Sequence, residues 1–228
     1  MTGRRTSAAL PPSLRAPLGL VAALAALVVS VIGALYAGHG LPGRVDRWIV
    51  APTADSVGPP WRRVALALDF LGEPVGSVLL VTVVVAGCLL LRRPRAAVLA
   101  VAGAVVVVGT ATLLKHLVGR TIHGADNLSY PSGHTAFFTA LALVVALLAT
   151  DRLGLGRTAG TSLVLGAALL AGAAMGWAEV ALGAHYPTDA LGGWCTALTV
   201  VPATAWLVDR AADRLAVRTA GAGRREPR

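Results

Sequence analysis

Apolar residues gather in six long runs along the chain. These runs fall at roughly 17–38, 74–91, 96–116, 133–150, 160–182 and 188–208. A helix of about 20 apolar residues crosses the hydrocarbon core of a bilayer. Such a segment must be helical, because lipid offers the backbone no hydrogen-bond partner. The pattern therefore predicts an all-α, polytopic membrane bundle with six transmembrane helices in one domain, over residues 17–208.

The segments outside these runs are polar. Residues 1–16 show no apolar period and are expected to form a disordered basic N-terminus. Residues 209–228 form a basic tail, which we expect to be disordered beyond about residue 216. The longest connection, 39–73, contains a stretch from Val45 to Val50 that could form a short amphipathic helix at the interface. An interfacial loop is the favoured interpretation there.

Arginine placement predicts the orientation in the membrane. The net charge is +9, and mean hydropathy is +0.72. Arginines gather before the first run, between the second and third, around 152–157, and after the last run. By the positive-inside rule these segments are cytoplasmic, as are both termini, and the protein is a multi-pass inner (plasma) membrane protein. Topology explains the basic clusters, so no nucleic-acid partner is expected.

Ionisable residues are costly in so apolar a chain, and their positions are informative. Three polar groups stand at ends of the runs, at 115–120, 130–135 and 179–189. On the predicted topology all three lie at the outer side of the membrane. One shared site on the outer face, at the level of lipid headgroups, is the economical interpretation.

The second polar group precedes the fourth apolar run. Ser132 is a candidate N-cap for the helix that follows, and a helix N-terminus attracts anions. Gly133 would let the backbone approach a bound anion closely. A plain capped helix with a chance histidine, His134, is an equally open alternative.

The third group contains His185 and Asp189, four residues apart. In a helical turn both side chains share one face, so the carboxylate could hold one imidazole nitrogen and leave the other free to attack. A histidine satisfied at a helix end is the alternative. In the first group Lys115 and Arg120 supply positive charge suited to phosphate. Alternatively, both side chains extend to the membrane interface.

These residues resemble the type 2 phosphatidic acid phosphatase superfamily. The run from Pro131 to His134 matches its central motif completely, and the run from His185 to Asp189, followed by two glycines, matches its third motif. The resemblance implies that His185 attacks phosphorus to form a phosphohistidine, that Asp189 orients it and that His134 protonates the leaving alkoxide. It also implies that the phosphate oxygens are held by Lys115, Ser132 and Gly133, without a metal or a cofactor.

Two positions depart from the family pattern. Ile122 and His123 stand where the first motif has Arg-Pro, and Ala178 and Glu179 stand where the third has Ser-Arg. Arg120 is expected to replace one missing arginine as a phosphate ligand. Glu179 is expected to form an ion pair with Arg120 or Lys115. The acidic residues are too few and too dispersed for a two-metal centre.

The favoured function is metal-independent hydrolysis of a lipid phosphate or diphosphate, of a polyprenyl or glycerolipid, on the outer leaflet. Membrane lipids and the lipid phosphate are the expected partners. Two alternatives stay open: a phosphotransferase with the same site, and a non-catalytic protein that binds lipid headgroups. Release of inorganic phosphate without an added acceptor separates these hypotheses.

Overall fold

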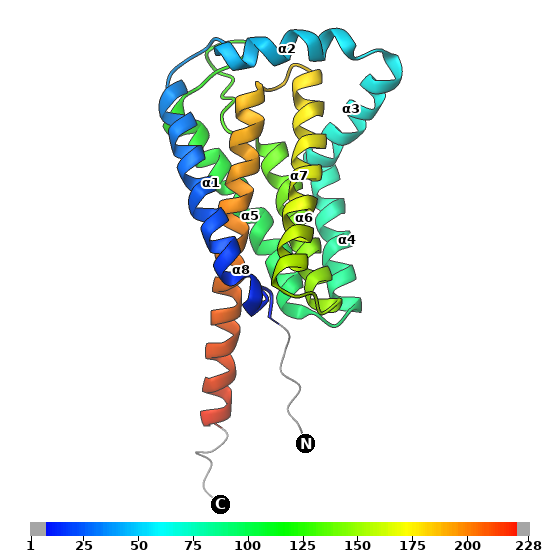
Figure 1. The fold of residues 1–228 in the computed structure, drawn as a ribbon, viewed down its shortest axis with the longest axis vertical. Helices are drawn as coiled ribbons and strands as arrows, with labels where there is room; N and C mark the ends of the chain where they lie inside the picture. Colours follow the sequence, from blue (N-terminus) through cyan, green and yellow to red (C-terminus); the bar gives the residue numbers. More distant parts are fainter. Residues whose placement is uncertain (1–7, 223–228) are drawn as a thin grey trace, which may run out of the picture.

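The computed structural model describes residues 8–222, and the regular structure of this part of the chain is helical. The elements are η1 (Pro12–Leu14), α1 (Arg15–Tyr36), α2 (Arg44–Ser56), α3 (Pro59–Gly72), α4 (Pro74–Leu90), α5 (Pro94–Val118), α6 (Gly133–Arg152), α7 (Arg157–Ala181) and α8 (Pro187–Ala222). Long helices run side by side along the molecule, and α2 lies across one end of the bundle (Figure 1). The predicted all-α membrane fold is confirmed.

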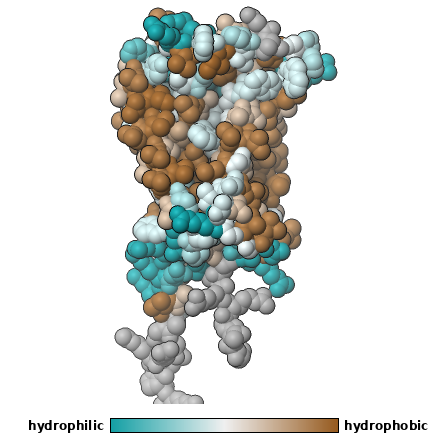
Figure 2. Space-filling view, viewed as in Figure 1, coloured by the Kyte–Doolittle hydropathy of each residue, from teal (hydrophilic) through white to brown (hydrophobic). Residues whose placement is uncertain are grey.

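All six apolar runs are helical, and most of their bounds differ from the prediction by only a few residues. Five helices (α1 and α5 to α8) are each long and apolar enough to cross a membrane. The pair of α3 and α4 passes the same test together, with a bend of 71° at the break between them. On the face shown in Figure 2, apolar residues cover the middle of the molecule and polar residues gather at both ends, as a bilayer requires.

The connection over 39–73 is the main difference from the prediction. We expected an interfacial loop, but the structure forms α2 and α3 there, so that interpretation was wrong. Pro59 and Pro60 occupy the first turn of α3, where a missing N–H costs nothing and the fixed φ favours a helix. In α2 the buried side is polar, since Asp46 is fully buried whereas Trp48 is exposed. An apolar stripe in the sequence would therefore not have identified the buried side of α2.

Both ends of the described chain are more ordered than expected. Within the supposedly disordered segment 1–16, Leu14 is fully buried, and the N–H groups of Ala9 and Leu10 donate to the carboxylate of Asp209 at 2.8 and 3.0 Å. Helix α8 continues to Ala222, beyond the expected end of the last span. Residues 1–7 and 223–228 lie outside the described residues, so the prediction is not tested for them.

The start of α1 and the end of α8 lie at the same end of the bundle, as an even number of spans requires (Figure 1). Basic residues line this end, where Arg93 pairs with Asp151 and Arg95 pairs with Asp209 and Asp213. Which side of the membrane this end faces stays a prediction, based on the positive-inside rule.

Glycines bring α8 against the start of α6. A Cβ on Gly193 would lie 2.3 Å from the carbonyl oxygen of Ser132, and one on Gly192 would lie 2.4 Å from Cε2 of Tyr130. Without side chains at these positions, the N–H of Ser132 donates to the carbonyl of Asp189 at 2.9 Å. The two glycines of the third motif therefore set the distance between the second and third motifs.

Candidate active site

Two histidines face one buried carboxylate at the far end of the bundle from the basic cluster. Nε2 of His185 lies 3.6 Å from Oε2 of Glu179, and Nδ1 of His134 lies 4.0 Å from the same oxygen. His134 comes from the first turn of α6, Glu179 from the last turns of α7, and His185 from the turn before α8. The second and third polar groups of the sequence thus meet in space.

Asp189 lies against the other nitrogen of His185. The distance from Nδ1 of His185 to Oδ2 of Asp189 is 3.7 Å, which is longer than a hydrogen bond. The carboxylate is itself fixed, because Oδ2 accepts the N–H of Tyr186 at 3.0 Å and Oδ1 accepts from Arg120 at 2.6 Å. Contacts of this kind in catalytic sites often tighten when substrate binds.

Arg120 occupies a different place from the one expected of it. Its guanidinium is fully buried and donates to Asp189 and Asp46, each at 2.6 Å. The expected ion pair between Arg120 and Glu179 is therefore wrong. The alternative partner, Lys115, donates instead to the carbonyl of Leu128. The charge of Arg120 is directed at two carboxylates, and the geometry favours a positioning role behind Asp189 over the predicted contact with phosphate.

Asp46 of α2 is a residue that the sequence analysis did not assign to the site. Its carboxylate accepts the N–H and the hydroxyl of Thr188 at 3.0 and 2.8 Å, in addition to the guanidinium of Arg120. Burial alone would raise the pKa of Asp46, but these hydrogen bonds, with one from the N–H of Gly43, hold that pKa below its ordinary value. Asp46 thus ties α2 to the turn that carries His185.

Ser132 is the N-cap of α6, as predicted. Its hydroxyl oxygen accepts the N–H of Thr135 at 3.2 Å, and its hydroxyl donates to Oγ1 of Thr135 at 3.0 Å. Its side chain is fully buried, whereas a Cβ on Gly133 would have no neighbour within 4 Å. Of these two predicted phosphate ligands, Gly133 is the one that borders open space.

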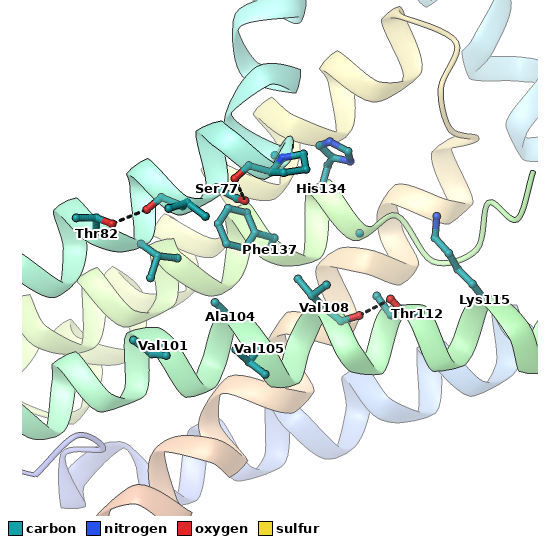
Figure 3. Close-up of a pocket in the computed structure, with 16 residues that line it drawn as sticks. Ser77, Thr82, Val101, Ala104, Val105, Val108, Thr112, Lys115, His134 and Phe137 are labelled. Carbon is teal, nitrogen blue, oxygen red and sulfur yellow. Dashed lines mark hydrogen bonds between the residues drawn. The ribbon is translucent and has the colours of Figure 1, made fainter.

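A cavity of about 720 Å³ lies between α4, α5 and α6. Lys115 and His134 lie toward one end of it (Figure 3). Gly133, the neighbour of His134 in the chain, also lines it. The ammonium group of Lys115 donates to the carbonyl of Leu128 at 2.9 Å. The remaining wall is mostly apolar and includes Val78, Val81, Val101, Val105, Val108 and Phe137. The cavity thus joins a polar end to an apolar passage that opens on the outer surface of the bundle, where Val78 and Val105 are exposed.

Two further acidic residues lie next to the site, although the sequence analysis did not assign them to it. Oδ1 of Asp69 lies 3.9 Å and Oε1 of Glu73 lies 3.8 Å from Nε2 of His134. They stand at the break between α3 and α4, where Gly72 packs so closely that a Cβ there would lie 1.8 Å from Cδ2 of His134. The acidic residues were expected to be dispersed, but the bend brings these two together.

Comparison with known proteins identifies the family. The PAP2 superfamily model matches residues 96–213, which is more than half of the chain. This chain belongs to the PAP2 superfamily. A solved structure with a similar fold is that of a transmembrane PAP2 type phosphatidylglycerolphosphate phosphatase from Bacillus subtilis. The two share 20% identity with a TM-score of 0.59, and the match covers 85% of this chain and 96% of that one. None of the curated proteins compared with it matches this chain.

This PAP2 protein departs from the family motif in charge at two positions. Ile122 is buried. His123 is exposed and lies outside the cavity, and its Nε2 is 2.7 Å from the carbonyl oxygen of Gly183. Glu179 lies between the two histidines where the family pattern has an arginine. This PAP2 protein therefore has a neutral side chain at one position where the pattern supplies a basic one, and an acidic side chain at the other.

Proposed function

We propose that this PAP2 protein hydrolyses a phosphate or diphosphate ester of a membrane lipid. The observation that carries the proposal is the placement of His134 and Lys115 at the polar end of an apolar cavity. His185 lies close to the same site, because His134 and His185 both approach the carboxylate of Glu179. A phosphorylated headgroup fits the polar end, and an acyl or polyprenyl chain fits the apolar passage. A water-soluble phosphate would have no use for that passage.

His185 is the nucleophile in this account. Its Nδ1 faces Asp189, so the carboxylate favours the tautomer with the proton on Nδ1 and leaves the lone pair on Nε2. Nε2 attacks phosphorus, the bond from phosphorus to the ester oxygen breaks, and a phosphohistidine forms. Arg120 and Asp46 act behind Asp189 by fixing its carboxylate.

His134 is the proton donor to the leaving oxygen. Its Nδ1 faces the space shared with Glu179 and His185, which is where the leaving group would stand. In the second step His134 takes a proton from water, and the water attacks the phosphohistidine to release inorganic phosphate. Lys115 and the N-terminus of α6 stabilise the charge on the phosphate oxygens.

The proposed site lies at the outer leaflet, because the arginine clusters predict that the opposite end is cytoplasmic. The substrate class is polyprenyl or glycerolipid phosphates and diphosphates.

Purified protein in detergent tests this function. Inorganic phosphate should appear from at least one member of a panel of lipid phosphates without an added acceptor, and His185→Ala should abolish its release. His116→Ala is the matched control, because His116 is exposed and lies outside the cavity, and it should retain activity. Loss of phosphate from the lipid only when an alcohol is added, with the phosphate recovered as the ester of that alcohol, would support a phosphotransferase. No loss of phosphate from any lipid of the panel, with or without an alcohol, would support headgroup binding without catalysis.

A further inference from the structure

Glu179 is buried in the middle of the site, where the family pattern has an arginine. Its side chain is 1% exposed, and no N–H or O–H group of the described residues donates to its Oε1. The titratable side chains that face it come from α3, the break before α4, α5, α6 and the turn before α8. These side chains are Asp69, Glu73, Lys115, His134 and His185.

Arg120 and Lys115 do not neutralise Glu179 by an ion pair. Arg120 is committed to two other carboxylates, and Lys115 donates to a backbone carbonyl. Nδ1 of His134 lies 4.0 Å away, beyond hydrogen-bond distance, and the other nitrogen of that ring faces two different carboxylates. A buried carboxylate without a partner is costly, so these surroundings favour a carboxyl group that keeps its proton.

The groups closest to Glu179 are hydrogen-bond acceptors. The carboxyl group of Asp69 lies within hydrogen-bonding reach of it. Nε2 of His185, whose lone pair attacks phosphorus in the proposed mechanism, lies 3.6 Å from Oε2. Two acceptors attract each other only through a hydrogen, so a proton on Glu179 suits both neighbours. Asp69 is 28% exposed and carries the charge of the pair more readily than Glu179 does.

We propose that Glu179 binds the phosphate group of the lipid as a neutral acid, donating its O–H to a phosphate oxygen from the place where the family pattern has an arginine. This inference rests on the proposed function, because it assigns a further residue to the same site. A carboxylic acid that its surroundings keep neutral can donate a strong hydrogen bond to an anion. The hydrogen bond passes from a neighbouring acceptor to the phosphate, and no covalent bond forms or breaks.

A carboxyl donor makes phosphate binding depend on pH. An arginine attracts phosphate at every ordinary pH, whereas Glu179 does so only while it holds its proton. Once ionised, it repels the phosphate, and two like charges about 6 Å apart at an effective dielectric of about 20 lower affinity about a hundredfold. Phosphate binding should therefore weaken as the pH rises. Glu179→Gln keeps an N–H donor at this place and cannot ionise, so it should lose this dependence.

Binding is measured with a long-chain alkylphosphonate, whose phosphorus–carbon bond the protein cannot hydrolyse. The Kd of the full-length protein in detergent is compared across pH for the wild type, Glu179→Gln and Asp126→Asn. Asp126 is an exposed acidic residue in the loop before α6, so Asp126→Asn is the matched control. Toward alkaline pH, the Kd of the wild type and of the control should rise at least about tenfold more than that of Glu179→Gln. Ionisation of the phosphonate itself is common to all three proteins.

Infrared spectroscopy observes the carboxyl proton directly. The carbonyl stretch of a neutral carboxyl group should appear in the difference spectrum between the wild type and Glu179→Gln, and should vanish over the pH interval in which the Kd rises. Asp69→Asn should lose its affinity at lower pH than the wild type, because a neighbouring carboxylate no longer resists ionisation of Glu179. This comparison needs only Asp69→Asn and the wild type, so it stands even if Glu179→Gln does not fold.

Phosphate release from the same samples separates this inference from the proposed function, since neither measurement requires turnover. Parallel Kd curves for the wild type and Glu179→Gln, or no carboxyl band at a pH where the phosphonate binds, would overturn the role of Glu179. Release of phosphate by those samples would leave the phosphatase intact. A Kd that depends on Glu179 as expected, with no phosphate released from any lipid phosphate, would overturn the phosphatase and leave Glu179 as a phosphate-binding residue.

Discussion

Arg120 donates to Asp46 at 2.6 Å although the two residues are 74 positions apart, and neither side chain is exposed. The same guanidinium donates to Asp189. The pair therefore links α2, which lies across the end of the bundle, to the carboxylate behind His185. A surface helix thereby becomes part of the support of the site.

Removing Arg120 should destabilise the protein strongly. Arg120→Ala leaves two buried carboxylates without their cation, and breaking a buried ion pair in this way costs about 3–5 kcal/mol. Asp46→Asn removes one of the charges and should cost less. The two losses should not add in the double variant, because both act on one network. Thermal unfolding in detergent measures all four proteins, and strictly additive losses would contradict the coupling.

Asp46 should make stability depend on pH in the acid range. Its pKa in the folded protein lies below the ordinary value of 3.8. Its contribution is thus complete above that value and is lost as the pH falls through the lower folded pKa. The wild type should lose thermal stability over this interval more steeply than Asp46→Asn does. Parallel curves for the two proteins, measured as Tm against pH, would contradict this assignment.

Gly193→Ala should separate α8 from the start of α6. The new Cβ would meet the backbone oxygen of Ser132 at 2.3 Å, and a backbone atom cannot move aside as a flexible side chain does. Overpacking of this kind costs about 1–3 kcal/mol. Gly87→Ala is the control within α4, where a Cβ would meet nothing within 4 Å, and it should be neutral or stabilising. Similar Tm values for the two variants would show that the close approach is unimportant.

Gly72→Ala should act on catalysis more than on stability. Its Cβ would lie 1.8 Å from Cδ2 of His134, so the imidazole must turn away from its place beside Asp69 and Glu73. We expect kcat to fall while Tm changes little, because the ring can move into the adjoining cavity. The variant's Tm and kcat are compared with those of the wild type, and unchanged kcat would mean that the ring position does not matter.

His134→Ala should slow poor leaving groups more than good ones. An alkoxide needs a proton as it departs, whereas p-nitrophenolate departs with little help. The factor by which His134→Ala lowers kcat on a lipid phosphate should therefore exceed the factor by which it lowers kcat on p-nitrophenyl phosphate. Equal losses would count against His134 as the proton donor.

The sequence predicted those features that depend on local pattern. Hydropathy is a local signal, so the six apolar runs were found, and the capping role of Ser132 and the shared face of His185 and Asp189 follow from spacing within one turn. These residues also lie in the two motifs that carry the family resemblance.

The partners of the site were not predictable, because they come from distant segments. Asp46 reaches Arg120 only because α2 folds over the end of the bundle, and no spacing in the chain signals it. Asp69 and Glu73 approach His134 because α3 and α4 bend by 71° at their break. The connection that contains Asp69 and Glu73 was expected to be a loop, so the sequence analysis did not assign either residue to the site.

In the proposed mechanism His185 carries the phosphoryl group. Wild-type protein is mixed with a lipid phosphate labelled with ³²P, quenched within the first turnover, digested, and its labelled peptide sequenced. We expect an acid-labile, alkali-stable label on the peptide that contains His185, and no label in His185→Ala. Label on a peptide containing His134 in its place, or rapid turnover by the wild type with no labelled peptide at any time, would contradict it.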